Sequence, residues 1–352
     1  MPVTAPQYAQ KLVSETSPAP IAGATAGLSV IRTTRRTFLC SLALAGLGGA
    51  SRASTAGGIR FGVTIADNVA FAPAFAAQEL GFFEEARLKV TFVPLRGAAV
   101  AEEALAAAHV DVIDHVVAYT GRAIAAGSDL RIVATASNGF LGWSLIVRAD
   151  SAAASVRDLV GKRIGVGPRL SVGDMAAQRL SDQVSGRFDL IHNGPGALVP
   201  ALRAGEIDAM LFSASVAQRE VAAGNARTLL DLTDPADRTA IYGYAASAEA
   251  REKRGEDLRR FLAATLRATA YMKKERDWSL RFLKTYVRVP DDAFAAILQD
   301  RIIANLSSNG ETRVDDVERA VALAARAWDA PTLADMPAER IFSNEFLPDD
   351  GA

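Results

Sequence analysis

The stretch ALAAAHVDV at residues 104–112 recurs further along the chain as ALRAGEIDA at residues 201–209. Two earlier pairs come before it in the same order: AAQEL (76–80) with AAQRL (176–180), and RFGV (60–63) with RIGV (163–166). One such match would carry little weight in an alanine-rich chain, but an ordered set at nearly constant separation indicates an internal duplication. A repeated unit of this size fixes the fold class, because each copy builds the same supersecondary structure.

Each copy has the pattern of strands that alternate with helices. Short apolar runs predict the strands, and apolar residues at helical spacing, such as Phe75, Leu80 and Phe83, predict the helices between them. Strands that alternate with helices form a mainly parallel sheet. We therefore predict an α/β fold with two lobes, each a mainly parallel sheet flanked by helices. The strands are expected at 59–65, 88–93 and 110–114 in the first copy and at 163–167, 187–192 and 207–212 in the second.

The segments outside the two copies complete the predicted domains. Apolar runs at 130–136 and 142–148 are expected to finish the first lobe and carry the chain across. A second crossing between the lobes is expected near 241–246. The predicted organisation is a first lobe of residues 59–148 plus 235–290, a second lobe of residues 149–234, and helices in 291–352 that pack on the first lobe.

The amino-terminal segment has the pattern of an export signal. Residues 38–50 are uncharged and apolar, too short for a membrane span but typical of a signal-peptide core. The residues directly before that core, TRRTFL at 34–39, resemble the twin-arginine export motif, and small residues at 54–56 suit cleavage. We expect residues 1–56 to be a signal peptide and the protein to be periplasmic, with an ordinary secretory signal as the alternative route.

Composition excludes several classes of function. The chain has 39 basic and 40 acidic residues and no basic run, which argues against nucleic-acid binding. Its one cysteine, Cys40, lies in the signal, and three histidines leave little for a metal site, so we expect no metal and no cofactor. The common catalytic motifs are missing, for example the glycine that a nucleophile elbow around Ser171 would need at position 169. We expect a monomer that is not an enzyme.

The order of motifs over residues 59–275 resembles a known family. FGV at 61–63, AP at 72–73, GFF at 81–83, GA at 97–98 and the two repeat stretches above resemble the nitrate/sulfonate/taurine substrate-binding proteins of ABC importers. The related thiamine-pyrimidine synthases of eukaryotes carry a cysteine-rich motif that this chain lacks. The resemblance implies a type II periplasmic-binding-protein fold with extra C-terminal helices. It also implies a solute-binding role, in which a small organic or oxyanion ligand is captured between the lobes and delivered to ABC permease and ATPase subunits.

Two other functions stay open at this point. One is an enzyme on the same fold, and the other is a ligand sensor that signals to a membrane receptor. Turnover of the bound compound would favour the enzyme, and neighbouring permease and ATPase genes would favour transport. The family binds chemically diverse small molecules, so the resemblance does not identify the ligand.

Ligands of open parallel sheets bind beyond the carboxyl ends of the strands, where loops and helix starts converge. Asn68 can equally cap the next helix, His115 can be a buried structural residue, and Arg169 can be a solvated surface charge. Arg169 is also bulkier than the small residues that the family has in this loop. Asp111 and Asp208 occupy equivalent repeat positions and are expected to be architectural, and Trp143 is expected to be core. The candidate ligand-binding residues are Asn68, Phe71, His115, Tyr119, Asn138, Phe140, Arg169, Ser171 and Ser213.

Overall fold

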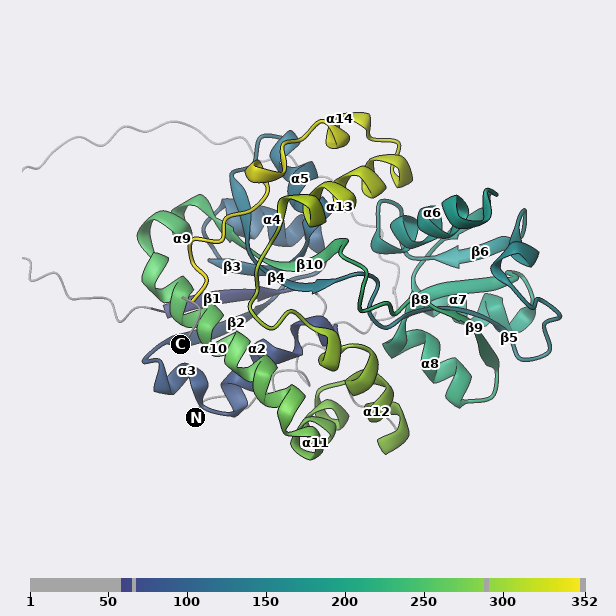
Figure 1. Ribbon diagram of the computed structural model, residues 1–352, viewed down its shortest axis with the longest axis horizontal. Helices are drawn as coiled ribbons and strands as arrows, with labels where there is room; N and C mark the ends of the chain where they lie inside the picture. Colours follow the sequence, from purple (N-terminus) through teal and green to yellow (C-terminus); the bar gives the residue numbers. More distant parts are fainter. Residues whose placement is uncertain (1–57, 65–67, 288–290, 349–352) are drawn as a thin grey trace, which may run out of the picture.

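The computed structural model describes residues 58–64, 68–287 and 291–348, and the predicted signal peptide lies outside them. In this part of the chain two five-stranded sheets lie side by side, each flanked by helices (Figure 1). The predicted α/β fold with two lobes is confirmed. We call the part built on the sheet with β1 lobe one, and the part built on the sheet with β6 lobe two.

The sheet of lobe one has the strand order β2-β1-β3-β10-β4. The first three strands are parallel, as a repeat of strand, helix and strand requires, and β10 runs antiparallel to both of its neighbours. The chain therefore returns to lobe one to place β10 between β3 and β4. The strands are β1 (Gly58–Val63), β2 (Lys89–Pro94), β3 (Val112–Val116), β4 (Leu130–Asn138) and β10 (Ala240–Ser247).

The sheet of lobe two repeats this arrangement as β7-β6-β8-β5-β9. Here β5 is the antiparallel strand, so each lobe receives its antiparallel strand from outside its own copy of the repeat. The strands are β5 (Trp143–Arg148), β6 (Arg163–Val166), β7 (Asp189–His192), β8 (Ala209–Ser213) and β9 (Ala226–Asp231).

The predicted boundary of lobe one at residue 148 is wrong in one respect. Residues 143–148 were expected to finish lobe one, but β5 pairs with β8 and β9 in lobe two. The reason is physical, because an apolar strand that is buried on both faces fits the middle of either sheet equally well. The second crossing also differs, since the chain crosses at 232–239 and residues 241–246 are already part of β10.

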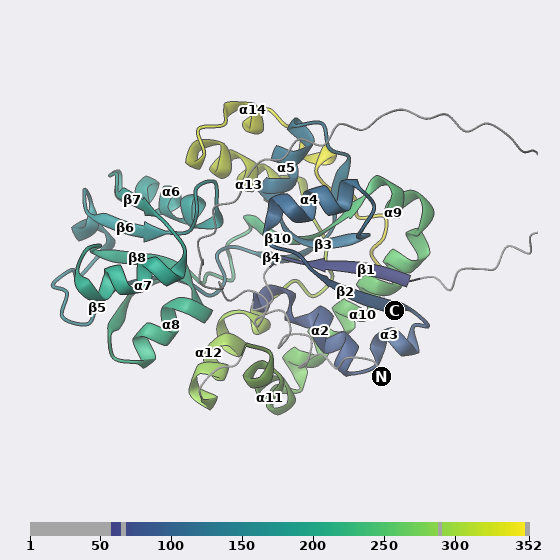
Figure 2. The same ribbon diagram turned by 180° about the vertical axis from the view of Figure 1, so that it is seen from behind.

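Helices cover both faces of each sheet and follow the order of the duplication (Figure 2). In both lobes a helix follows the first, second and third parallel strands, as the repeat predicts. Lobe one has η1 (Val69–Phe71), α2 (Ala72–Glu79), α3 (Phe82–Glu85), α4 (Ala98–Ala106) and α5 (Val117–Ala125). Lobe two has η2 (Val156–Leu159), α6 (Val172–Val184), α7 (Pro195–Ala204) and α8 (Ala214–Ala222).

The duplication is also visible in the chemistry at the start of β1 and β6. Arg60 donates to Asp111 through its backbone N–H and its guanidinium, at 2.8 and 2.9 Å, and also donates to the carbonyl of Ala108. Arg163 repeats the pattern with Asp208, at 2.9 and 3.3 Å, and with the carbonyl of Gly205. Both aspartates thus join neighbouring strands of their sheet, which gives them the architectural role expected from the sequence.

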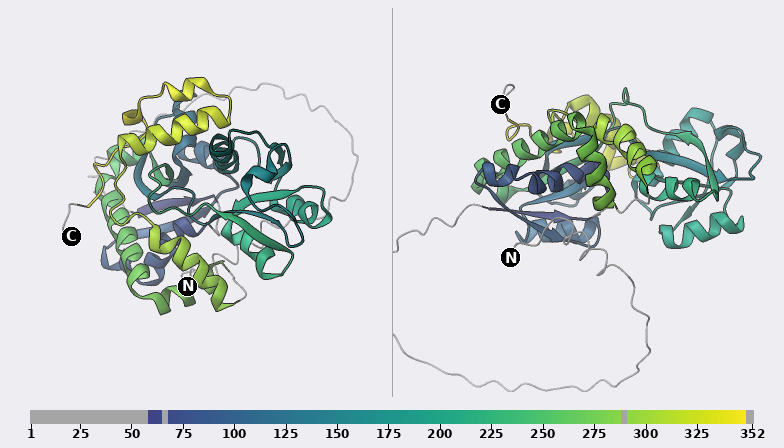
Figure 3. Two further views of the ribbon diagram at one scale, coloured as in Figure 1. Left: turned by 45° about the vertical axis from the view of Figure 1, so that its right-hand side comes forward. Right: turned by 90° about the horizontal axis from the view of Figure 1, so that it is seen from below.

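The C-terminal helices extend lobe one and also reach lobe two (Figure 3). Helix α10 packs on α2 and α3, where Phe83 stacks on Phe261 with ring centroids 5.5 Å apart. Helix α13 contacts both α5 and α6, and α12 contacts α8. The sequence predicted that these helices pack on lobe one, and it did not predict their contacts with lobe two. The helices are α9 (Ala248–Lys253), α10 (Gly255–Lys274), α11 (Arg276–Val287), α12 (Asp292–Arg301), η3 (Ile303–Asn305), α13 (Val314–Ala327), α14 (Pro331–Ala334) and η4 (Ala338–Arg340).

The apolar core does not divide cleanly between the lobes. One cluster of buried side chains fills lobe one beneath α2 and α10. A second cluster includes Ile113 of lobe one, Val166 and Met175 of lobe two, and Val321 of α13, so it continues across the contact between the lobes. Among the described helices, none is both long enough and apolar enough to cross a membrane.

Candidate ligand-binding site at the lobe junction

The two lobes meet at the carboxyl ends of their parallel strands. The chain crosses there twice, at residues 139–142 and 232–239, and the two crossings are joined because the backbone N–H of Gly139 donates to the carbonyl of Thr239 at 2.7 Å. Helices α5, α6 and α8 begin at the ends of β3, β6 and β8. We call this region, from the strand ends to the first turns of the following helices, the lobe junction.

Three polar side chains come together across the lobes in this region. The hydroxyl of Tyr242 on β10 interacts with the side chains of Asn68 and of Trp143, which begins β5. Phe71 packs edge-on against Tyr242, with ring centroids 5.8 Å apart. Burial raises the pKa of Tyr242 to about 12, so the phenol keeps its proton at neutral pH. Asn68 also accepts from the backbone N–H of Ala70 at 3.1 Å, so its capping and junction roles coexist.

A second group surrounds His115 at the end of β3. The imidazole is buried, and its ring centroid lies 5.8 Å from that of Tyr119 on the first turn of α5. Its Nε2 atom lies 3.5 Å from a carboxylate oxygen of Glu102, which is 3.6 Å from the guanidinium of Arg122. Burial lowers the pKa of His115 to about 3, so the ring is neutral. A neutral ring in this place can donate or accept one hydrogen bond.

Lobe two contributes the start of α6. The Tyr119 hydroxyl interacts with the backbone of Val172, so lobe two contacts lobe one at the next residue after Ser171. The Asp174 carboxylate accepts from the backbone N–H of Ser171 at 3.0 Å and lies 2.6 Å from Nε2 of His192. These contacts fix the first turn of α6 beside Tyr119.

Ser213 ends β8 at the same junction. It lies opposite Trp143 in the register of β5 and β8, and its hydroxyl is 3.1 Å from that of Ser215. The neighbouring Phe212 stacks on Trp143 with ring centroids 6.0 Å apart. The two hydroxyls therefore lie next to the aromatic side chains that join the lobes.

Three candidate residues are placed differently. Arg169 is exposed in the loop before α6. Phe140 is fully buried beneath the guanidinium of Arg179, whose central carbon is 5.7 Å from the ring centre, so it belongs to the core at the crossing. The amide nitrogen of Asn138 is 3.5 Å from the carboxylate of Asp316, and Asn138 lines a polar pocket of about 230 Å³ beside the crossing at 232–239.

Polar atoms that make no hydrogen bond within the described protein gather at this junction. They include the buried Oγ of Ser137 and Oδ1 of Asn138, whereas the two other buried atoms near this site, Nε2 of His115 and Oε1 of Glu102, face each other at 3.5 Å. Buried polar groups are normally hydrogen-bonded, so such atoms point to a missing partner. Helices α5 and α8 also begin here with no acidic residue in the first turn and no side chain bonded to their first N–H groups. The junction therefore offers donors that suit a polar or anionic group.

Sequence reasoning missed Tyr242, Asp174 and Trp328. Tyr242 lies on the strand that returns from lobe two, and Trp328 lies beyond the segment that carried the family resemblance. A usable signal existed only for Asp174, because Ser171 and Asp174 have the spacing of a helix capping box. Trp143 is buried as expected, yet its side chain also interacts with Tyr242 across the junction.

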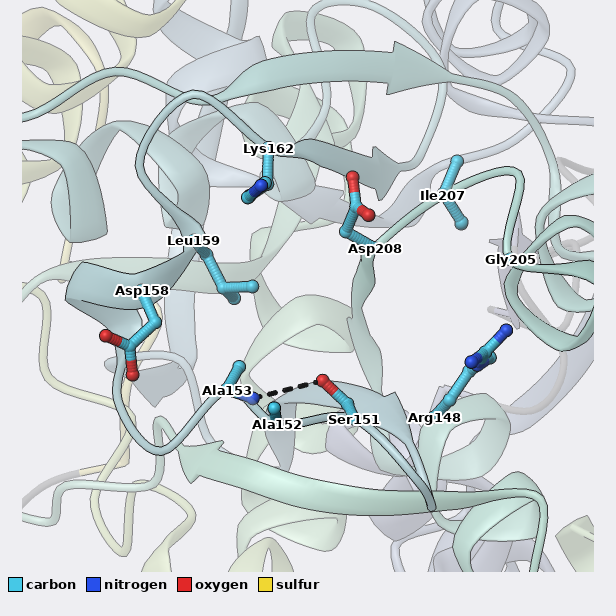
Figure 4. Close-up of a pocket in the computed structure, with 10 residues that line it drawn as sticks. All are labelled: Arg148, Ser151, Ala152, Ala153, Asp158, Leu159, Lys162, Gly205, Ile207 and Asp208. Atoms are coloured by element: carbon cyan, nitrogen blue, oxygen red, sulfur yellow. Dashed lines mark hydrogen bonds between the residues drawn. The ribbon is translucent and has the colours of Figure 1, made fainter.

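A pocket of about 450 Å³ lies at the opposite end of lobe two, where β6 and β8 begin (Figure 4). Several of its charged side chains have local partners. Asp158 accepts from the backbone N–H of Ser155 at 2.8 Å, and Arg148 pairs with Asp150 at 2.9 Å. Because these groups are occupied by the fold itself, we do not place the site there. Among the described residues, no group of three His, Cys, Asp or Glu side chains is arranged to hold a metal ion.

Comparison with known proteins agrees with this architecture. The alkanesulfonate-binding protein SsuA of Xanthomonas axonopodis pv. citri, solved with MOPS, is 20% identical with a TM-score of 0.63, and the match covers 81% of this chain and 98% of that one. The periplasmic aliphatic sulphonate-binding protein SsuA of Escherichia coli is 20% identical with a TM-score of 0.68, and the match covers 82% of this chain and 99% of that one. The desulfurization enzyme DszB is 15% identical with a TM-score of 0.56, and the match covers 82% of this chain and 97% of that one. These likenesses show the fold.

No curated protein sequence matches this chain significantly. The model of one family does match, over residues 68–277, which include β10 and most of both lobes. That match covers more than half of the chain. The chain therefore belongs to the NMT1/THI5-like family.

Proposed function

We propose that this protein is the solute-binding component of an ABC importer and captures a small ligand at the lobe junction. The observation that carries the proposal is the pair of uncapped starts of α5 and α8, beside the buried, unpartnered Oγ of Ser137 and Oδ1 of Asn138. A ligand placed there would supply the missing hydrogen bonds from both lobes at once. Only a ligand with differential affinity for the closed arrangement shifts the equilibrium towards it.

The ligand class we propose is a small organic anion or oxyanion of the sulfonate, nitrate or taurine kind. Backbone N–H groups at helix starts favour negative charge, and the neutral imidazole of His115 can donate one further hydrogen bond. Arg169 is exposed in the loop before α6, where it can fold over an anion once the lobes close. The related fold of two sulfonate-binding proteins supports this choice of class.

We propose that the protein works in the periplasm as a monomer, after removal of residues 1–56, and delivers its ligand to permease and ATPase subunits. Asn68, Phe71, His115, Tyr119, Ser171 and Ser213 are the proposed contacts, together with Tyr242. Asn138 and Phe140 stay candidates that act from the crossing between the lobes. Light scattering of the mature protein should give the mass of a single chain at micromolar concentration.

The decisive experiment is calorimetry with ethanesulfonate, taurine and nitrate, with the uncharged dimethyl sulfone as the matched neutral compound. We expect an anion to bind and the sulfone not to bind. Tyr119→Phe should weaken binding about threefold to tenfold, because it removes the hydroxyl that contacts lobe two. Tyr271→Phe is the control, since Tyr271 packs far away between Phe82 and Trp278.

Arg169 separates two types of ligand. If the ligand is an anion, Arg169→Ala should cost about tenfold to a hundredfold in affinity, and Arg169→Lys should recover only part of it. Wild-type affinity in Arg169→Ala would favour an aromatic ligand held by Phe71 and Tyr119 instead. Native mass spectrometry of the freshly purified protein identifies any ligand that co-purifies. Conversion of that compound into a new product would replace the binding function by an enzymatic one.

A further inference from the structure

Helix α13, in the described C-terminal part of the chain, contacts a helix that follows a proposed binding segment in each lobe. It contacts α5 of lobe one and α6 of lobe two, and Figure 3 shows it lying across the side of the molecule where these helices approach. A single apolar cluster contains Val117 of α5, Val172 and Met175 of α6, and Trp328, the residue directly after α13. Trp328 is buried.

Trp328 contacts one proposed binding residue on each lobe. Its indole Nε1–H donates to the carbonyl oxygen of Ser171 at 3.3 Å. Its ring lies 5.5 Å from the ring of Tyr119, and the guanidinium of Arg122 covers both rings at 5.9 and 5.0 Å. The indole thus holds the Ser171 peptide and the Tyr119 ring in a fixed relation.

The loop that Trp328 contacts needs external support. Leu170 has φ of 60°, a left-handed conformation that costs free energy for a bulky residue, and the residue is 41% exposed. Strained backbone persists only where its surroundings determine it. Here the Ser171 peptide is held from both sides, since Asp174 accepts from its N–H at 3.0 Å and Trp328 donates to its carbonyl.

The opposite flank of the molecule joins the lobes without contacting this loop. Arg301, at the end of α12, pairs with Asp231 of β9 at 2.9 Å, and Arg219 of α8 donates to the carbonyl of Val287 at 3.0 Å. These contacts lie on strands and helices near the crossings. They give a control that changes contact between the lobes while leaving the Ser171 peptide intact.

We propose that Trp328 is a positioning residue for the binding site, which holds the 167–171 loop against Tyr119 so that both lobes present their contacts to the ligand together. The proposal rests on the proposed function for the identity of the site. It adds to that site a C-terminal residue that lies outside the family match of residues 68–277. The hydrogen bond from the indole Nε1–H, and not the volume of the ring alone, holds the loop in position.

The test uses the complete mature protein and three variants: Trp328→Phe, Trp328→Ala and Arg301→Gln. Amide hydrogen exchange of residues 167–174 is measured without ligand, beside calorimetry with ethanesulfonate as the probe. Trp328→Phe keeps most of the buried ring but loses the donor. We expect its loop amides to exchange at least about threefold faster and its affinity for the probe to fall about threefold to tenfold. Trp328→Ala should show both effects more strongly.

Arg301→Gln should lower the melting temperature but leave the exchange of residues 167–174 unchanged. Unchanged loop exchange in Trp328→Phe would overturn the proposal, and so would a loop that is loosened equally by Arg301→Gln. A third result is that neither the wild type nor any variant binds ethanesulfonate, while Trp328→Phe still speeds the exchange of the loop amides. That result would contradict the proposed ligand class but support the role of Trp328 in holding the loop.

Discussion

At the scale of the residue, the imidazole of His115 is held neutral by its surroundings. Burial lowers its pKa from 6.5 to about 3. The unfolded chain therefore binds more protons than the folded chain between these values, so stability is lost as the pH falls from about 6.5 towards about 3. Burial raises the pKa of the adjacent Glu102, so its contribution has the opposite sign and is lost as the pH rises.

Replacing the ring should flatten this dependence. We expect His115→Asn to reduce the slope of unfolding free energy against pH, between pH 6 and 4, by up to about 1.4 kcal/mol per pH unit. Urea denaturation at several pH values measures it. His109→Asn is the control because His109 is exposed. Parallel curves for all three proteins would contradict the buried, neutral state of His115.

The left-handed conformation of Leu170 should destabilise the protein, and Val160, which is equally exposed but not left-handed, is the residue for comparison. Both residues are 41% exposed, but Leu170 has φ of 60° and Val160 has φ of −61°. Leu170→Gly removes the left-handed strain and should raise the unfolding free energy by up to about 1 kcal/mol. Val160→Gly adds flexibility to the unfolded chain and removes the packing of Val160 against Gly186, so it should lower the unfolding free energy by at least about 0.5–1 kcal/mol. Chemical denaturation measures both, and equal losses would show that Leu170 is not strained.

At the scale of the element, the two copies of the repeat provide an internal comparison. Asp111 and Asp208 join equivalent strands, but the side chain of Asp111 is 4% exposed and also lies 3.4 Å from Arg254, while that of Asp208 is 34% exposed. Charge pairs gain strength as they leave water, and removing one partner of a buried pair leaves an uncompensated charge.

The same substitution should therefore have different effects in the two lobes. Asp111→Asn should lower the unfolding free energy by about 1.5–3 kcal/mol, because the buried carboxylate accepts charge-assisted hydrogen bonds from Arg60 and lies beside Arg254. Asp208→Asn should cost about 1 kcal/mol or less. Thermal and urea unfolding of the two variants decide it. Equal losses would mean that exposure does not control these pairs.

The elements also show what the sequence could predict. The duplicated strands were predictable because short apolar runs and ordered matches are local signals. The partner of β5 was not, since an apolar strand buried on both faces carries no information about which sheet it enters. Strand β9 was missed because most of its residues are only partly buried and its pattern is weak.

Candidate site residues followed from topology, since Asn68, His115, Tyr119 and Ser171 all lie at the ends of predicted parallel strands. The structure does bring these four to the lobe junction, and their contact with a ligand stays a prediction. Tyr242 and Trp328 were missed because they reach the junction from segments far along the chain. No local pattern marks a residue whose position depends on the return of β10 or on the packing of α13.

At the scale of the whole molecule, the lobes differ in how they are assembled from the chain. The strands of lobe two, from β5 to β9, form one continuous segment, residues 143–231. The sheet of lobe one is completed only by β10, which lies between β3 and β4. Lobe two is thus an insertion within lobe one, although both come from copies of the same unit.

This difference predicts the behaviour of fragments. A fragment of residues 143–233 contains a complete sheet and should form it alone, with dispersed amide resonances, although it exposes the apolar side chains that it shares with lobe one. A fragment of residues 58–142 lacks the strand between β3 and β4 and should stay unfolded or aggregate. Adding residues 240–287 to the second fragment through a short linker should restore folded structure, because it supplies β10 and α10. A well-dispersed spectrum of 58–142 on its own would contradict this account.

The late arrival of β10 also affects the protein while the ribosome is still making it. From the synthesis of Asn138 until that of Ala240 and its successors, β3 and β4 each present an unpaired inner edge with no strand between them. Such edges readily pair with other chains. During this interval lobe one is vulnerable to aggregation, while lobe two can already be folded. A chaperone would have to cover the inner edges of β3 and β4 until β10 has been made.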